Sequence, residues 1–262
     1  RRRTAAEFGI VPGREQHARD RAGAAAVPRA GEVEVRRATA AFRTEVIGDC
    51  TLYLGDCMEI MPTLGRVDAV VTDPPYGVDF AEWDGSRPPD AWFDLIKSKA
   101  DSCAVHCVQG EMWAWPRPDW VMAWFMPGSV NRTRAGKFRH WEPVLVYGEE
   151  RAAVDSRTFP PVGAERNGHP CPKPDAIAMW LVESFAAERE IILDPFMGSG
   201  TTGVACVRLN RKFIGIEMHE PYFDIACRRI EEEYRRGDFL TDRGMLKVPQ
   251  AEFLPTKRKR TK

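Results

Sequence analysis

Two short segments of this chain combine residue types that could do chemistry together. The first, Asp73-Pro74-Pro75-Tyr76, offers an acid, a stiff backbone and an aromatic face to a planar amine. The second, residues 194–203, reads Asp-Pro-Phe-Met-Gly-Ser-Gly-Thr-Thr-Gly, and a glycine-rich loop of this kind could cradle a cofactor. Taken together, the two segments suggest the transfer of a group to a nucleobase.

Each segment directly follows an apolar run that we expect to be a buried β-strand. Residues 67–72 lead into Asp73, and residues 191–193 lead into Asp194. In open α/β sheets, ligands bind in the crevice at the carboxyl ends of the strands. We therefore interpret both segments as functional loops at strand ends.

The remaining patterns predict the elements that must position these loops. Apolar runs predict further strands at 45–48, 50–55, 103–108, 120–125, 143–147 and 212–216. Helices are expected at 57–64, 91–99, 175–187, 202–209 and 221–235, and in the third of these Ile177, Trp180, Leu181 and Phe185 keep the spacing of a buried face. The alternation of helices and strands after residue 175 predicts an α/β fold with a parallel sheet and helices on its faces.

The charge around the glycine loop favours one class of cofactor. Gly198, Gly200 and Gly203 satisfy the pattern of a dinucleotide-binding turn, and Glu217 ends the next strand, where an acid could hold ribose hydroxyls. Asp194, immediately before the loop, would repel phosphates and attract a cationic ligand. S-adenosylmethionine, whose amino group and sulfonium are positive, is therefore favoured over NAD.

At this point the sequence resembles a known family. The segment from Asp194 to Thr202 resembles the S-adenosylmethionine loop of the amino-group DNA methyltransferases, and Asp73-Pro74-Pro75-Tyr76 resembles their catalytic motif. The resemblance covers roughly residues 45–236. Because the catalytic motif precedes the cofactor loop, the chain looks like the beta arrangement of the family, which is a circularly permuted order.

Two shorter segments add to this resemblance. Gly55-Asp56-Cys57 resembles the family segment that touches the cofactor adenine. Residues 169–174, His-Pro-Cys-Pro-Lys-Pro, resemble the family's His-Pro-Thr-Gln-Lys-Pro, from which Cys171 and Pro172 depart. The helix after that segment flanks the methionine part of the cofactor in the family.

The resemblance implies a doubly wound, mostly parallel, Rossmann-like methyltransferase sheet of the seven-stranded type, with a small irregular substrate-recognition insertion. It also implies two groups of site residues. The catalytic group is Asp73, Pro74, Pro75 and Tyr76. The cofactor-binding group is Asp56, Lys173, Asp194, Phe196, Gly198, Ser199, Gly200, Thr201, Thr202 and Glu217.

The catalytic motif suits the chemistry of a base amine, which is a poor nucleophile because its lone pair is delocalised into the ring. A carboxylate oxygen of Asp73 and the carbonyl of Pro74 could accept its hydrogen bonds and aim the lone pair at the methyl group. Tyr76 could stack on a base rotated out of the duplex. Asp at the first motif position is commoner in the family's adenine enzymes and Ser in its cytosine enzymes, so we expect adenine.

Double-stranded DNA is the expected partner, although lysine plus arginine balances aspartate plus glutamate at 38 each. Binding would therefore need local positive charge. The central candidates for phosphate contacts are Arg132, Arg134, Lys137 and Arg139, and each end of the chain also carries a basic run. Because the resembled enzymes are often dimers, a homodimer is one expectation, and a restriction endonuclease partner stays open.

The rest of the composition points to a soluble, cytoplasmic enzyme. There is no apolar run of about 18 residues and no signal-peptide core, so we expect no membrane association. The seven cysteines are odd in number and show no disulfide spacing. Cys103, His106 and Cys107, with His169 and Cys171, lack the paired spacing of a zinc site, and we expect no metal.

The domain organisation follows from these patterns. Residues 1–43 are expected to form a flexible, Arg/Ala-rich N-terminal extension, and 44–246 the catalytic domain. Within it, 148–172 lacks periodicity and is the expected target-recognition insertion. Residues 247–262 form a basic C-terminal tail.

Four alternatives to an adenine enzyme stay open. The nearest is methylation of the cytosine N4 amine, and a more distant one is a structured RNA substrate. An NAD-dependent oxidoreductase would use the glycine loop but leave Asp73-Pro74-Pro75-Tyr76 unexplained. A silent DNA-binding module fits poorly with an intact acid, prolines and tyrosine.

Overall fold

The computed structural model describes residues 42–77, 85–130, 136–152, 154–160 and 173–242 of the chain, with side chains through residue 237. Its strands are β1 (Arg43–Ile47), β2 (Cys50–Leu54), β3 (Ala69–Thr72), β4 (Ser102–His106), β5 (Trp120–Phe125), β6 (Trp141–Tyr147), β7 (Ser156–Thr158), β8 (Ile191–Asp194) and β9 (Lys212–Glu217). Its α-helices are α1 (Cys57–Ile60), α2 (Asp90–Lys99), α3 (Asp175–Phe185), α4 (Thr201–Arg208) and α5 (Glu220–Asp242). Two short 3₁₀ turns, η1 (Met61–Thr63) and η3 (Met112–Ala114), follow α1 and β4.

The strands form one sheet in the order β1-β2-β9-β8-β3-β4-β6-β5-β7. The five strands from β2 to β4 in this order are mutually parallel, whereas β6 runs antiparallel to both β4 and β5. Without β1 and β7 at its two ends, the sheet has the expected seven-stranded arrangement. The predicted doubly wound, mostly parallel α/β fold is therefore confirmed.

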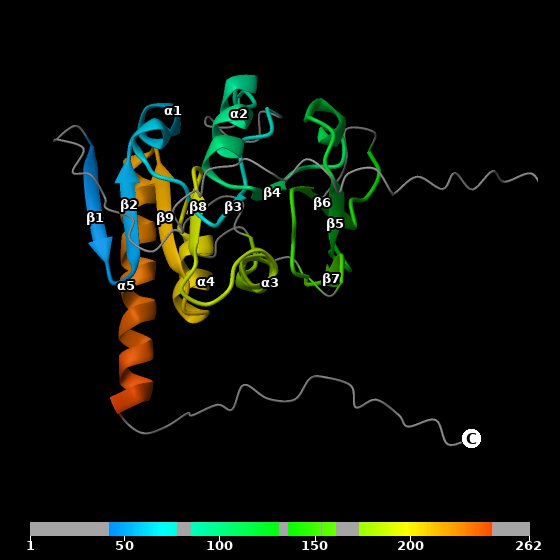
Figure 1. Cartoon of the computed structure of the whole chain (residues 1–262). Helices are drawn as coiled ribbons and strands as arrows, with labels where there is room; N and C mark the ends of the chain where they lie inside the picture. The colour runs from blue at the N-terminus through cyan, green and yellow to red at the C-terminus, as the bar shows by residue number, and fades with distance from the viewer. Residues whose placement is uncertain (1–41, 78–84, 131–135, 153, 161–172, 243–262) are drawn as a thin grey trace, which may run out of the picture. The chain divides into compact units, whose positions relative to one another are not determined.

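Helices cover both faces of this sheet (Figure 1). Val71 and Ile192 belong to the apolar layer beneath α3, α4 and α5, and their neighbours Val70 and Leu193 belong to the layer beneath α1 and α2. Successive residues of a strand point to opposite faces of the sheet. A continuous apolar run therefore contributes side chains to the apolar layers on both faces.

The helices begin and end largely where the sequence predicts. In α3, which follows Pro174, the expected buried face of Ile177, Trp180, Leu181 and Phe185 is buried. Pro62 follows α1, and the predicted helix continues there only as the 3₁₀ turn η1. The last helix, α5, is longer than expected and packs Phe223, Ala226 and Ile230 into the core.

One strand was missed and several expectations lie outside the described residues. The strand β7 pairs in parallel with β5 inside the segment predicted to be irregular; its Ser-Arg-Thr sequence is too short and polar to show alternation. Residues 1–41, 161–172 and 243–262 lie outside the described chain, so the predicted boundaries of the extension, insertion and tail stay predictions. None of the helices described has the length and apolar character needed to cross a bilayer.

The cysteines that were considered as zinc ligands are core residues as far as the structure describes them. Cys103 and Cys107 are buried, and burial raises the pKa of each thiol to about 12. His169 and Cys171 lie outside the described residues. No group of three or more metal-ligating side chains occurs within the described ranges.

Gly203 provides a test of the packing between α4 and its neighbours. A Cβ at this position would lie 2.6 Å from Ile230 Cδ1 and 2.8 Å from Phe213 Cε1. Gly203→Ala should therefore lower the free energy of unfolding by about 1–2 kcal/mol, because overpacking outweighs the better helix propensity of alanine. Urea unfolding measures this change.

Gly237→Ala is the matched control. Gly237 lies in α5 and a Cβ there would have no neighbour within 4 Å. This substitution should raise the free energy of unfolding by about 0.5–1 kcal/mol. Equal effects of the two substitutions would contradict the close approach at Gly203.

Candidate active site

The parallel strands bring acidic and titratable residues to one edge of the sheet. Asp56 follows β2, Glu217 ends β9, Asp194 ends β8, Asp73 follows β3 and His106 ends β4. In sheet order, β8 and β3 are neighbours, yet the chain leaves β8 toward β9 on one side and leaves β3 toward β4 on the other. This is a topological switch point, the place where ligands bind in open α/β sheets.

A direct hydrogen bond joins the two loops. The Thr72 hydroxyl, at the end of β3, donates to Asp194 Oδ1 at 2.8 Å, and the amide of Phe196 donates to the same oxygen at 3.1 Å. Asp194 is only 2% exposed. Burial raises its pKa to about 7, despite the hydrogen bonds from Thr202 and Thr72 that favour its ionised form. A cation close to the glycine loop would favour the ionised carboxylate.

The backbone of the glycine loop requires residues without a Cβ. Gly198 and Gly200 both have positive φ, at 51° and 81°. A Cβ on Gly200 would also lie 2.9 Å from that of Ala226 in α5. The amide of Met197 donates to the Ile216 carbonyl at 3.0 Å, which holds the loop against β9. The sequence thus forms a tight turn whose backbone can approach a ligand closely.

Glu217 is tied to the same loop. Its Oε2 accepts a hydrogen bond from the Gly198 amide at 2.9 Å, and its Oε1 accepts one from the His219 amide at 2.7 Å. The Met218 amide is a further backbone donor to this carboxylate, which as a whole can accept about four hydrogen bonds. Met218 follows directly and exposes 62% of its surface. Met218 was not among the predicted site residues, although it is an apolar residue directly after the strand-ending acid.

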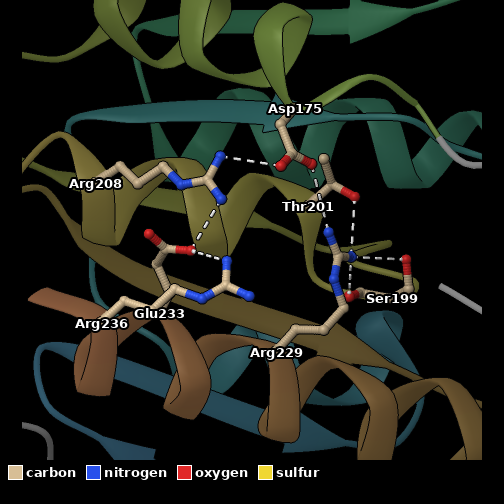
Figure 2. A network of polar contacts seen from close by, with 7 residues as sticks. All are labelled: Asp175, Ser199, Thr201, Arg208, Arg229, Glu233 and Arg236. Carbon is tan, nitrogen blue, oxygen red and sulfur yellow. Dashed lines mark hydrogen bonds and ion pairs between the residues drawn. The ribbon is translucent and has the colours of Figure 1, made fainter. Parts of the chain in front are cut away.

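The hydroxyls of Ser199 and Thr201 have a protein partner, as Figure 2 shows. Arg229 Nη1, from α5, donates to the Ser199 carbonyl at 2.6 Å, to Ser199 Oγ at 3.1 Å and to Thr201 Oγ1 at 3.2 Å. Both residues were predicted to contact the cofactor. In the structure their side chains lie toward Arg229.

The catalytic loop contains a polar cluster that sequence spacing did not suggest. Lys173 Nζ lies 3.0 Å from Asp73 Oδ2 and donates to the Tyr76 hydroxyl at 3.0 Å. That hydroxyl in turn donates to Asp73 Oδ1. The Lys173 ammonium also lies 5.4 Å from the centre of the Tyr76 ring. Lys173 was expected among the cofactor residues; the structure places it beside Asp73.

These neighbours set the charge of the cluster. Burial by itself would raise the pKa of Asp73, but Lys173, His106 and the Tyr76 hydroxyl hold it below its ordinary value. Burial and the adjacent Asp73 raise the pKa of Tyr76 well above its usual range. Asp73 is therefore an ionised hydrogen-bond acceptor at neutral pH, and Tyr76 keeps its proton.

Two further buried groups extend the cluster toward β4 and β6. Glu142, near the start of β6, lies 3.5 Å from Lys173 Nζ and 3.1 Å from Arg139 Nη2. His106 is buried, and burial together with the positive charge of Lys173 lowers its pKa to about 4. His106 is thus neutral at physiological pH. The ammonium of Lys173 therefore lies beside two carboxylates, those of Asp73 and Glu142.

The remaining predicted residues are divided between site and scaffold. Pro74 is buried and Pro75 is partly exposed. Phe196 packs on Trp92, with 5.4 Å between the ring centres. Asp56 caps α1 by accepting a hydrogen bond from the Met58 amide at 2.8 Å. Of the predicted DNA contacts, Lys137 is exposed and Arg139 is paired with Glu142, whereas Arg132 and Arg134 lie outside the described residues.

The glycine loop fits a cationic nucleoside cofactor. Gly198 and Gly200 leave its backbone open, the carboxylate of Glu217 can accept a further hydrogen bond from a diol, and Met218 offers an apolar surface at the same edge. The carboxyl of Asp194 lies at the base of the loop and can ionise beside a cation, since its pKa is about 7. These four features suit the adenosine and the positive charge of S-adenosylmethionine better than a pyrophosphate.

Comparison with known proteins gives consistent results. A DNA methylase family model matches residues 110–228. YubD of Escherichia coli (strain K12), named as a methylase, is 33% identical over 67% of this chain and 88% of its own length. The type II methyltransferase M.HpaI of Haemophilus parainfluenzae is 36% identical over 68% of this chain and 72% of its own. In fold, the crystal structure of the M1.HpyAVI–SAM complex is similar, with a TM-score of 0.56, 24% identity, and coverage of 69% of this chain and 99% of that one.

The buried carboxyl of Asp194 should make stability depend on pH. Its pKa is about 7 in the folded protein against an ordinary value of 3.8, so the folded state holds this proton more tightly than the unfolded chain does. This contribution is complete below about pH 4 and is lost as the pH rises to about 7, for a total of up to about 4 kcal/mol. Urea unfolding of the wild type and Asp194→Asn at several pH values between 4 and 8 measures it.

The comparison with Asp194→Asn isolates this one group. Titration of Glu217, whose pKa burial raises, and of His106, whose pKa burial lowers to about 4, occurs in both proteins and cancels in the difference. The wild type should lose stability relative to the variant as the pH rises. Parallel curves for the two proteins would show that Asp194 titrates as an ordinary carboxyl.

Proposed function

This chain belongs to the amino-group DNA methyltransferase family, and we propose that its acceptor is the N6 amine of an adenine in double-stranded DNA. The observation that carries the proposal is the ionised Asp73 at the switch point, one hydrogen bond away from the glycine loop through Thr72 and Asp194. The resembled adenine enzymes more often carry Asp at this position, and the cytosine enzymes Ser.

The residues of the site can each be given a task. S-adenosylmethionine, the cofactor of this family, supplies an electrophilic methyl group when bound. Gly198, Gly200 and Glu217 would hold its adenosine part, and Asp194 would balance its positive charge. None of these residues needs to form a covalent bond with the substrate.

The catalytic loop would hold the acceptor amine. An oxygen of Asp73 and the Pro74 carbonyl would accept hydrogen bonds from its two N–H groups, which localises the nitrogen lone pair and directs it toward the cofactor. The N–CH₃ bond would form as the S–CH₃ bond breaks, and the methylated amine would then release one proton to solvent. The Tyr76 ring supplies a face for the extruded base. Because the Lys173 ammonium now contacts both Asp73 and the Tyr76 ring, the incoming amine would replace part of that contact.

The segment before β6 would meet the DNA near this loop. β6 runs antiparallel to β4, so its first residues lie at the edge of the sheet where β4 ends, and the Cys107 amide bonds to the Pro143 carbonyl at 3.1 Å. Residues 136–140 therefore enter the sheet from the edge that carries Asp73. This placement supports the basic stretch that includes Arg132, Arg134 and Lys137 as a phosphate-contacting segment.

The proposed acceptor is tested by incubating DNA with the protein and S-adenosylmethionine, digesting it to nucleosides and identifying the methylated one by mass. We expect N6-methyl-2′-deoxyadenosine from the wild type. Asp73→Ala should lower turnover about a hundredfold or more, because a positioned acceptor is lost, while calorimetric affinity for S-adenosylmethionine changes little. The separation of turnover from affinity is the expected signature.

Two outcomes would contradict this assignment in different ways. If the wild type produces N4-methyl-2′-deoxycytidine, the acceptor is cytosine and not adenine, and the role of Asp73 stays intact. Nearly full activity of Asp73→Ala would instead remove Asp73 from the mechanism.

The phosphate-contacting segment predicts a salt effect. The double substitution Arg132→Gln and Arg134→Gln should weaken DNA binding at all sequences. It should also lower the slope of log binding constant against log salt concentration by about two, since each lost phosphate contact removes about one. Arg235→Gln on α5 is the control, because that exposed side chain pairs with Glu231 at 2.9 Å. An unchanged slope in the double variant, or an equal change in the control, would refute the assignment.

A further inference from the structure

Arg229, in the last helix, α5, donates hydrogen bonds to the glycine loop (Figure 2). Arg229 Nη1 contacts three acceptors in the loop: the Ser199 carbonyl at 2.6 Å, the Ser199 hydroxyl at 3.1 Å and the Thr201 hydroxyl at 3.2 Å. The Arg229 side chain is only 15% exposed. One guanidinium nitrogen therefore holds both ends of the turn that leads into α4.

The other side of the same guanidinium faces α3. Arg229 Nη2 lies 3.5 Å from Asp175 Oδ1, and the second oxygen of Asp175 lies 2.9 Å from Arg208 Nη1. Asp175 is the first residue of α3 and follows Lys173 by two positions. Lys173 in turn lies 3.0 Å from Asp73 Oδ2. Arg229 thus connects the glycine loop to the segment that supplies the counter-ion of Asp73.

We propose that Arg229 is a positioning residue for methyl transfer: it fixes the cofactor loop through Ser199 and Thr201 and links that loop, through Asp175, to Lys173 at the catalytic loop. The proposal rests on the function proposed above, in which the glycine loop holds S-adenosylmethionine and Asp73 holds the amine. Arg229 acts through these residues and needs no contact with either substrate.

The physical reason is the flexibility of the loop. Gly198 and Gly200 give the turn access to conformations that other residues avoid, so ordering it on ligand binding costs conformational entropy. A guanidinium has a rigid planar array of donors, and hydrogen bonds from a charged donor are stronger than neutral ones. Arg229 orders the loop in advance, and preorganisation of this kind raises affinity.

The same network contains a matched control. Arg208 pairs with Asp175 at 2.9 Å and with Glu233 at 2.9 Å, and both of its partners lie in helices. Arg208→Met and Arg229→Met each remove one arginine from the network, but only Arg229 contacts Ser199 and Thr201. A purely structural role for the network predicts similar effects of the two substitutions.

The decisive experiment is calorimetric titration of each variant with S-adenosylmethionine, together with thermal unfolding. Arg229→Met should weaken binding about tenfold or more, because charged hydrogen bonds to the loop are lost, and Arg208→Met should stay within about twofold of the wild type. Arg229→Lys should recover part of the affinity, since an ammonium can reach some of the acceptors. If Arg229→Met does not fold, Arg229→Lys against Arg208→Lys gives the same comparison.

The link to the catalytic loop is tested with Asp175→Asn, which leaves the contacts of Arg229 with Ser199 and Thr201 in place. It should lower kcat about threefold or more while the KM for S-adenosylmethionine stays within about twofold. Wild-type affinity in Arg229→Met, or equal losses in Arg229→Met and Arg208→Met, would overturn the positioning role. An unchanged kcat in Asp175→Asn would overturn the link to Lys173.

These results are separable from a failure of the proposed function. The affinity measurements need no DNA and do not depend on which base is methylated. Wild-type protein that binds S-adenosylmethionine but methylates cytosine would leave the role of Arg229 intact. Wild-type protein that does not bind S-adenosylmethionine would remove the proposed function itself.

Discussion

The pairing of β3 with β8 is the constraint on which the site depends. These neighbouring strands belong to parts of the chain about 120 residues apart, and their parallel pairing places the catalytic loop and the glycine loop side by side. The hydrogen bond from Thr72 to Asp194 closes this junction within a buried environment. Each loop alone is a turn after a strand. Their adjacency at the point where the chain leaves in opposite directions brings the two predicted site loops together.

The charges around this junction have different tasks because their surroundings differ. Asp194 is enclosed, and burial raises its pKa to about 7, so its charge depends on what lies near the glycine loop. Asp73 has the Lys173 ammonium beside it, which holds its pKa low and keeps it an acceptor. Two aspartates at adjacent strand ends thereby differ in charge state: the pKa of Asp194 is raised by burial and that of Asp73 is lowered by its neighbours.

Local patterns were sufficient for most of the fold. Continuous apolar runs located the strands, because a parallel strand is buried on both faces of the sheet. The buried face of α3 was predicted from the three-to-four spacing of Ile177, Trp180, Leu181 and Phe185, because one side of a helix that packs on a sheet is apolar. The strand β7 escaped prediction because three polar residues carry no periodicity and pair only where β5 offers a free edge. The glycines of the cofactor loop were readable since positive φ angles restrict the residue type.

By itself, the sequence determined the two motif loops, the strands that carry them and the kind of chemistry they suit, since these are properties of short contiguous segments. Only the tertiary structure decided which side chains the motif residues meet. Lys173 contacts Asp73 and Tyr76, and Arg229 contacts Ser199 and Thr201, across separations of 28 to 100 residues along the chain. Such contacts leave no periodic signal, because the partners are single long side chains whose positions depend on how helices pack on the sheet.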